Sequence, residues 1–156
     1  MGNYQLNVPT MFCGAGRIEL HDTVFGFPPY RGSNLIEARC AEAYIKIGRS
    51  YINNDFYCCA EHGNITIGDD CLIGTGVQII NSDFHHISIA KRHQGEARSA
   101  DVCIEDNVFI GSNVRIMKGV TVGYGAVIAN SAVVFENVAP RTIVKGNPAI
   151  IEDIKD

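Results

Sequence analysis

Two adjacent histidines, His85 and His86, are the residues of this chain best suited to proton transfer. They stand in the segment Asn-Ser-Asp-Phe-His-His-Ile, residues 81–87, directly before a polar stretch at residues 88–100. An imidazole ordinarily titrates near a pH of about 6.5, so it can take a proton from a substrate and return it near neutral pH. A histidine at the base of an exposed loop is also accessible to a ligand. The segment therefore indicates a general base.

Asp83 lies two residues before His85. Side chains two residues apart in an extended chain project to the same face, so the Asp83 carboxylate can hold the second ring nitrogen of His85. A backbone carbonyl or Glu61 can do the same. Asp83 can also be a turn residue, because Asn-Ser-Asp favours local hydrogen bonds to the backbone. The sequence leaves these interpretations open.

The elements that must position these residues follow a repeat of six. Large aliphatic residues recur at every sixth position, and smaller residues follow four positions later. A period of six fits neither an amphipathic helix nor an alternating strand. A unit this short cannot bury its own apolar face and must stack on copies of itself. The large positions are Ile67, Ile73 and Ile79, and then Ile104, Ile110, Ile116, Val122, Ile128 and Val134.

Three such units, each a short strand and a turn, close one triangular coil. Ile104 and Val122 are then expected one above the other, about 4.8 Å apart as neighbouring strands are. The step from Ile79 to Ile104 is not a multiple of six, so the repeat is interrupted between them. Residues 88–100 are therefore expected to form a loop that leaves the stack. Such loops often carry function.

The composition restricts the class of protein. A length of 156 residues fits a single domain, residues 1–156, and 13 Lys and Arg against 17 Asp and Glu give a net charge of -4. This charge provides no basic surface for nucleic acid. No apolar run approaches the length of a membrane span, and the first ten residues do not resemble a signal peptide, so we expect a cytoplasmic protein without membrane insertion. The tail, residues 139–156, holds a Gly-Asn-Pro turn and a segment expected to be helical.

The six cysteines have no C-x-x-C spacing. We interpret them as buried reduced thiols rather than as metal or redox ligands. Cys58 and Cys59 are adjacent, and in a strand they would point to opposite faces, which disfavours a shared metal.

Several motifs together resemble the hexapeptide-repeat acyltransferases, and more narrowly the maltose/galactoside and surface-polysaccharide O-acetyltransferases. They are the six-residue repeats, the Asn-Ser-Asp-Phe-His-His-Ile segment, the polar loop, Val108-Phe-Ile-Gly-Ser-Asn113 and Val144-Lys-Gly-Asn-Pro-Ala149. The resemblance covers about residues 44 to 154. It implies an all-β fold, a left-handed parallel β-helix, assembled as a homotrimer with active sites between subunits.

The resemblance also implies a reaction. The catalytic histidine of the family falls on His85, and His86 replaces the proline that follows it. His85 would take the proton of a hydroxyl group on a sugar or saccharide, which then attacks the thioester of acetyl-CoA without a covalent acyl-enzyme. Backbone N–H groups near Gly111 and Ser112 would stabilise the oxyanion across a subunit interface. No metal is expected.

By the same resemblance, Asn53 would contact the acceptor. Glu61 is a further candidate for the acceptor pocket, where the loop of one subunit would meet the flank of another. Acetyl-CoA would lie along Ser112, Asn130, Phe135 and the turn Lys145, Gly146, Asn147 and Pro148. Ile150 and Asp153 stand where relatives that acetylate sugars have arginines, which weakens the expected phosphate contact, and Phe109 stands where many relatives have tryptophan. These departures bear on the acceptor more than on the reaction.

Two other functions fit parts of the sequence. A gamma-type carbonic anhydrase would bind zinc through His85 and His86 with His62 or His93. The chain lacks that family's pair of histidines five residues apart, and its Gly-Asn-Pro tail fits a user of CoA. A non-catalytic scaffold would have neither a base at the loop nor affinity for CoA.

Overall fold

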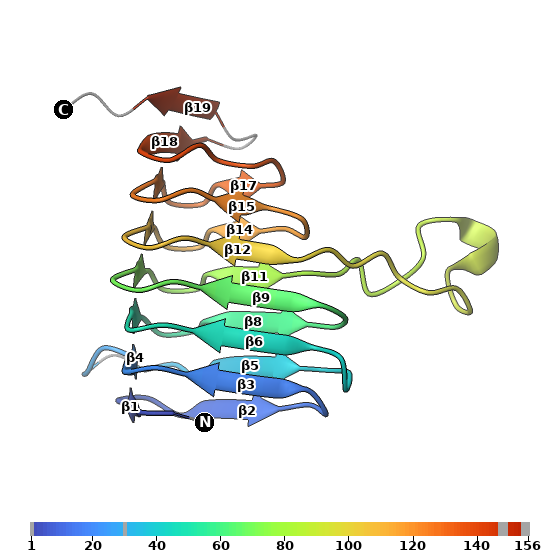
Figure 1. Cartoon of the computed structure of the whole chain (residues 1–156), viewed down its shortest axis with the longest axis horizontal. Coiled ribbons are helices and arrows are strands. Elements are labelled where there is room, and N and C mark those ends of the chain that lie inside the picture. The colour runs from blue at the N-terminus through green and yellow to red at the C-terminus, as the bar shows by residue number, and fades with distance from the viewer. Residues whose placement is uncertain (1, 30, 147–149, 154–156) are drawn as a thin grey trace.

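The chain winds into a stack of three-sided coils, and one loop leaves the stack sideways (Figure 1). This computed structural model describes residues 2–29, 31–146 and the backbone of residues 150–153. The strands form three sheets, which we name A, B and C. Sheet A contains β1 (Tyr4–Leu6), β4 (Thr23–Phe25), β7 (Tyr51–Ile52), β10 (Leu72–Ile73), β13 (Phe109–Ile110), β16 (Val127–Ile128), β18 (Thr142–Lys145) and β19 (Ile150–Asp153).

The other two sheets complete each coil. Sheet B contains β2 (Thr10–Cys13), β5 (Asn34–Ala38), β8 (Tyr57–Ala60), β11 (Gln78–Ile80), β14 (Arg115–Ile116) and β17 (Val133–Val134). Sheet C contains β3 (Arg17–Leu20), β6 (Tyr44–Ile47), β9 (Asn64–Ile67), β12 (Val102–Ile104) and β15 (Thr121–Val122). Among the strands that the structure describes, pairing is parallel except between β18 and β19.

The period of six forms the core as predicted. Ile104 pairs with Val122 in sheet C, and Ile110 pairs with Ile128 in sheet A. All four side chains are at most 1% exposed. Each buried aliphatic side chain contributes roughly 1.5–3 kcal/mol before its conformational entropy is subtracted. Stacked aliphatic ladders therefore hold the coils together.

The outer faces of the sheets differ in polarity. The outward row of sheet A runs through Tyr51, Leu72, Phe109 and Val127, which pair in register. The corresponding row of sheet C is Lys46, Thr66, Cys103 and Thr121. Sheet A thus presents an apolar strip to the outside, whereas sheet C does not.

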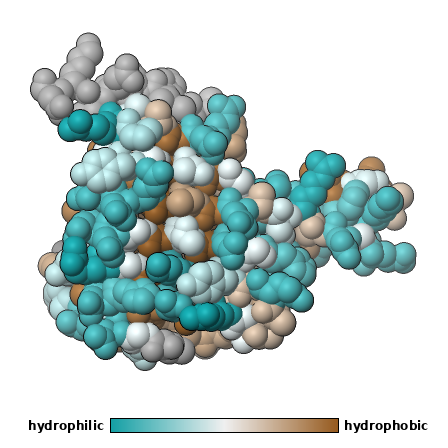
Figure 2. Space-filling model, viewed as in Figure 1, coloured by the Kyte–Doolittle hydropathy of each residue, from teal (hydrophilic) through white to brown (hydrophobic). Residues whose placement is uncertain are grey.

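The loop begins earlier than the sequence predicts. Ser82 and Ser99 form an antiparallel bridge, and Asp83 N–H donates to the Arg98 carbonyl at 3.0 Å. At the neck, the outgoing and the returning segments of the chain thus form hydrogen bonds between their backbone groups outside the sheets. Beyond the neck the loop contains a 3-10 turn, η1 (Ile89–Lys91). In Figure 2 the loop surface is mostly hydrophilic, with hydrophobic atoms near its tip.

The tail extends the solenoid. β18 continues sheet A beside β16, and β19 returns antiparallel to β18. The expectation of a helical segment was wrong, because residues 150–153 form backbone pairs with β18 instead. In the described part of the chain, no helix is both long and apolar enough to cross a bilayer.

The turns between strands stack into corners, which we name by the sheets that they join. The A-B corner contains residues 26–27, 53–54, 74–76, 111–113 and 129–131, and we include with it Lys145, the last residue of β18, and Gly146, which continue the same edge. The B-C corner contains residues 39–43, 61–63, the neck and loop at 81–101, 117–120 and 135–137.

Candidate functional site

The residues predicted from the sequence lie at two different corners of the stack. The B-C corner carries Glu61, Asp83, His85 and Phe135. The A-B corner carries Asn53, Gly111, Ser112, Asn130, Lys145 and Gly146. The width of sheet B separates the two groups. Ser112 and Met117 span one such crossing, roughly 16 Å at 3.3 Å per residue. Asn147 and Pro148 lie outside the described residues.

The two histidines have different environments. His85 is exposed and has no hydrogen bond, ion pair or ring contact with the described residues. His86 is half-buried, and its Nδ1 accepts the N–H of Ser88 at 3.0 Å. A Cβ placed on Gly95 would lie 3.0 Å from His86 Cδ2, so this ring packs inside the loop. His85 is therefore the histidine whose ring is open to a ligand.

The Asp83 carboxylate contacts a lysine of the next coil. Its Oδ1 accepts from Lys118 Nζ at 2.7 Å. Its Oδ2 is buried and has no hydrogen-bond partner among the described residues. In this conformation Asp83 anchors the loop base and makes no contact with the His85 ring.

Glu61 also contacts the loop base. Its carboxylate accepts from Ser82 Oγ, and its backbone N–H donates to Asn81 Oδ1 at 2.8 Å. Arg39 Nη1 lies 4.0 Å from Glu61 Oε1. This carboxylate is 17% exposed, so most of its surface is covered by its own chain.

The backbone groups predicted to bind the oxyanion are engaged in this conformation. Gly111 N–H donates to the Ile128 carbonyl at 2.7 Å, as a bond of the sheet ladder. Ser112 N–H donates to Asn130 Oδ1 at 2.8 Å. Asn130 is exposed, so its side chain has room to rotate and release Ser112 N–H. Gly111 N–H has no such freedom, because a ladder bond holds it.

Close stacking at the A-B corner requires glycine. A Cβ on Gly74 would lie 2.7 Å from Ser112 N, and one on Gly111 would lie 2.3 Å from Asn130 Oδ1. Both distances are shorter than van der Waals contact allows. The absence of side chains at these positions lets Gly74, Ser112 and Asn130 form a continuous edge.

A cavity of about 220 Å³ lies at the lower end of this edge, beside Asn53. Its lining contains no charged residue, and the Asn53 amide is its main polar group. The Asn53 Oδ1 accepts the N–H of Asn54 at 2.8 Å, which fixes the orientation of the amide. The cavity is lined by Gly26, Phe27, Tyr51, Ile52, Asn53, Leu72, Ile73, Gly74 and Phe109.

The cysteines are free thiols in this structure. Cys58 packs in the core, and Cys59 is buried beside Glu37 on the outer side of β8. Burial raises the pKa of the Cys59 thiol to about 11. Within the described residues, no group of three or more His, Cys, Asp or Glu side chains is placed to hold a metal ion. One chain therefore does not supply the three-histidine site that the zinc interpretation needs.

Two basic residues at the loop base were not predicted from the sequence. Arg39 lies with its guanidinium 4.7 Å from the centre of the Phe84 ring, and Lys118 pairs with Asp83. Both contacts join residues that are far apart in the chain. The sequence offers only the local Glu37 and Arg39 pair as a signal. The Arg39 guanidinium holds the pKa of the Glu37 carboxyl below its usual value.

Comparisons with known proteins agree on one family. The family model described as "Hexapeptide repeat of succinyl-transferase" matches residues 64–79 and 101–136, on either side of the loop. The chain is 32% identical over 152 residues to a chloramphenicol acetyltransferase of Escherichia coli, covering 78% of this chain and 72% of that one. It is 34% identical over 113 residues to the galactoside O-acetyltransferase of Escherichia coli K12, covering 72% of this chain and 55% of that one.

A solved structure is similar over almost the entire chain. It is a hexapeptide-repeat acetyltransferase of Vibrio cholerae O1 biovar El Tor in complex with acetyl-CoA. The TM-score is 0.66 at 28% identity, covering 99% of this chain and 72% of that chain. The predicted left-handed parallel β-helix is confirmed. The chain spans about half the length of the first curated relatives that it matches.

Proposed function

The chain belongs to the hexapeptide-repeat acetyltransferase family, and we propose that it transfers an acetyl group from acetyl-CoA to a hydroxyl group of a sugar or saccharide. The observation that carries the proposal is the division of the site residues between two corners. An exposed histidine lies at the B-C corner, and a glycine-lined edge with an uncharged cavity lies at the A-B corner.

His85 is the proposed general base. Its ring nitrogen takes the proton of the acceptor hydroxyl while the oxygen attacks the thioester carbonyl of acetyl-CoA. The tetrahedral intermediate then expels the CoA thiolate, and His85 returns the proton to the sulfur. The products are an acetyl ester and free CoA. No cysteine is needed as a nucleophile, which agrees with the raised pKa of the Cys59 thiol.

Ser112 N–H is the proposed donor to the oxyanion. In the free enzyme Asn130 Oδ1 accepts this hydrogen, and the approaching thioester carbonyl would replace it. A donor of this kind typically contributes about 2.7–4 kcal/mol. Gly111 has no part in this proposal as a donor, because its N–H belongs to the sheet ladder. Its role is to let Asn130 approach.

The acceptor is proposed to bind in the cavity beside Asn53. Aromatic and aliphatic side chains suit the C–H face of a sugar ring, and a single amide suits a hydroxyl group. The galactoside O-acetyltransferase among the relatives supports a sugar acceptor. Acetyl-CoA would lie above it, along Ser112, Asn130, Lys145 and Gly146.

A second copy of the chain would complete the site. His85 leaves the stack at one corner and Ser112 lies at another, so His85 of one subunit would face the A-B corner of its neighbour. Repeated around an axis, this contact closes a ring, and we propose the homotrimer. Glu61 and Phe135 would then border the crevice from the side of the loop. The apolar outer row of sheet A supports burial between subunits.

The test is the release of CoA from acetyl-CoA in the presence of a panel of sugars, followed with a thiol reagent. We expect release with at least one sugar. His85→Ala should lower the turnover number by a factor of about 10² to 10⁴ while CoA binding is retained. The proposal would be overturned if no sugar of the panel led to CoA release. A fully active His85→Ala variant would overturn the assignment of His85 as the base.

Two other histidines of the loop serve as controls. His93→Ala alters an exposed residue near the tip and should keep the turnover number. His86→Ala removes the ring that accepts from Ser88, so it should loosen the loop with a smaller loss of activity than His85→Ala. If His86→Ala were inactive and His85→Ala active, His86 would be the base.

A further inference from the structure

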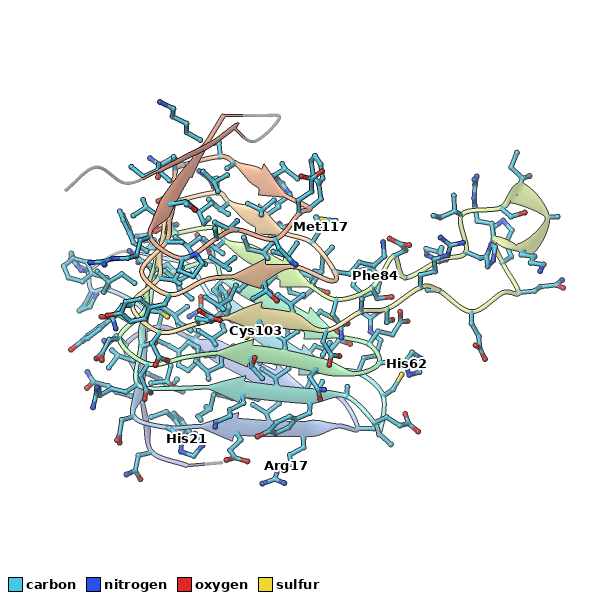
Figure 3. All side chains as sticks on the ribbon, turned by 45° about the horizontal axis from the view of Figure 1, so that its top comes forward. Arg17, His21, His62, Phe84, Cys103 and Met117 are labelled. Atoms are coloured by element: carbon cyan, nitrogen blue, oxygen red, sulfur yellow. The ribbon has the colours of Figure 1, made fainter. Side chains whose placement is uncertain are left out.

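Phe84, the residue before the proposed base, has an unusual backbone conformation. Its φ is +58°, in the left-handed region that bulky side chains rarely adopt. The chain turns there from the neck into the loop, and Figure 3 places Phe84 where the loop joins the stack. A residue in this region keeps its conformation only when its surroundings hold it. The direction of the next side chain, His85, depends on that conformation.

Arg39 covers the ring of Phe84. The guanidinium carbon lies 4.7 Å from the ring centre, within the range of a cation–π contact. Glu37 fixes the plane of the guanidinium through two hydrogen bonds, from Nε to Oε1 at 2.9 Å and from Nη2 to Oε2 at 3.0 Å. A two-pronged bond of this kind fixes orientation as well as position. The Arg39 guanidinium is thus held in a fixed orientation over the Phe84 ring.

A second set of contacts holds the backbone of Phe84. Its N–H donates to Ser82 Oγ at 3.0 Å, and the Ser82 hydroxyl donates to the Glu61 carboxylate. Glu61 lies 4.0 Å from Arg39 Nη1. These contacts therefore form a closed ring of side chains from three successive coils, which consists of Arg39, Phe84, Ser82 and Glu61.

We propose that Arg39 is a positioning residue for His85. It holds Phe84 in the left-handed conformation and so fixes the direction in which the His85 ring points toward the reacting groups. This inference rests on the proposed function. Lysine at position 39 would keep the positive charge but would lose both the two-pronged bond and the flat face over the ring.

The test compares Arg39→Lys with a matched control. Arg17 lies 5.5 Å from the ring centre of Tyr44 and makes a single ion pair with Glu19 at 2.6 Å, so it combines a ring contact and a carboxylate contact far from the loop. With acetyl-CoA and the best acceptor of the panel, Arg39→Lys should lower kcat at least tenfold and leave the KM for acetyl-CoA unchanged. Arg17→Lys should change neither value.

A double-variant cycle separates positioning from a general effect on folding. Glycine adopts a positive φ at no steric cost, so Phe84→Gly removes the ring that Arg39 holds. In that background Arg39→Lys should cause no further loss of kcat. Equal losses in both backgrounds would overturn the inference, because Arg39 would then act without Phe84.

Thermal unfolding of each variant completes the test. An unchanged kcat in folded Arg39→Lys, with only a lower unfolding midpoint, would also overturn the inference. His85→Ala in the same assay distinguishes the two proposals. If His85→Ala is inactive and Arg39→Lys is fully active, positioning by Arg39 is wrong and the proposed function stands. If His85→Ala is active, the assignment of His85 as the base is wrong, and the positioning inference is wrong with it.

Discussion

Asp83, at the base of the loop, pairs with Lys118 of the next coil at 2.7 Å between Oδ1 and Nζ. The side chains are 21% and 30% exposed, so this ion pair is partly shielded from water. It links the neck of the loop to the turn that follows β14. The pair therefore couples the loop to the coil above it.

Lys118→Met should destabilise the protein by about 1–3 kcal/mol, because it leaves a largely covered carboxylate without its partner. Adding Asp83→Asn should restore part of the loss, since a neutral amide costs less to bury than a charge. Urea unfolding measures both values. Lys46→Met, at an exposed outward position of β6, is the control and should stay within about 0.5 kcal/mol of the wild type. If Lys46→Met lowered the free energy of unfolding by as much as Lys118→Met, the Asp83–Lys118 pair would have no particular effect on stability.

Two inactive variants should complement each other if the site lies between subunits. His85→Ala removes the base from the B-C corner. Gly74→Leu damages the A-B corner, because its Cβ would lie 2.7 Å from Ser112 N. Co-expressed chains would form interfaces that combine an intact His85 with an intact A-B corner. We expect CoA release from the mixture and almost none from either variant alone. A mixture as inactive as its components, with mixed oligomers confirmed by mass spectrometry, would place both groups in one subunit.

The buried Cys59 thiol should make stability fall at alkaline pH. Its pKa is raised to about 11 by burial, whereas an unfolded thiol titrates at about 8.5. The unfolded chain therefore loses this proton first as the pH rises. The contribution is fully present below about pH 8.5 and is lost progressively on the way to pH 11.

Urea unfolding at pH 8, 9 and 10.5 checks this sign. The free energy of unfolding should fall less steeply with pH in Cys59→Ala than in the wild type. Cys103→Ala, which removes a half-buried thiol on the outer face of sheet C, provides the comparison. Identical slopes in the wild type and Cys59→Ala would contradict the prediction.

The regular part of the fold was predictable because residues that are eighteen positions apart in the repeats stack on one another. Ile104 stacks on Val122, which follows it by three repeats, as the period of six requires. In the lower coils, large aliphatic residues also stack on one another, but their spacing in the sequence is irregular. Ile52 stacks on Ile73, although the two are further apart in the chain than three repeats, because extra residues occupy the corners. The spacing of residues in the sequence does not predict which of them stack wherever a corner contains an insertion of variable length.

The candidate residues of the site can be named from the sequence, but their contacts cannot. His85 stands out because it follows a break in the repeat, and the break is visible in the sequence. The partner of Phe84 is not visible, because Arg39 reaches it only after two irregular coils are stacked. Likewise, nothing in the sequence says that Asn130 occupies Ser112 N–H. Such contacts depend on the register between coils, which the irregular turns set.

The bridge between Ser82 and Ser99 has a consequence for how the protein can change. The chain leaves the stack and returns to it at one point, so the coils on either side keep their register whatever lies between. Loop closure becomes only slowly more costly with length, by about 0.6 kcal/mol for each doubling. Residues 87–98, which follow the proposed base beyond the bridge, can therefore vary in length and sequence while the stack keeps its register. A new loop can alter the choice of acceptor while the edge proposed for acetyl-CoA stays as it is.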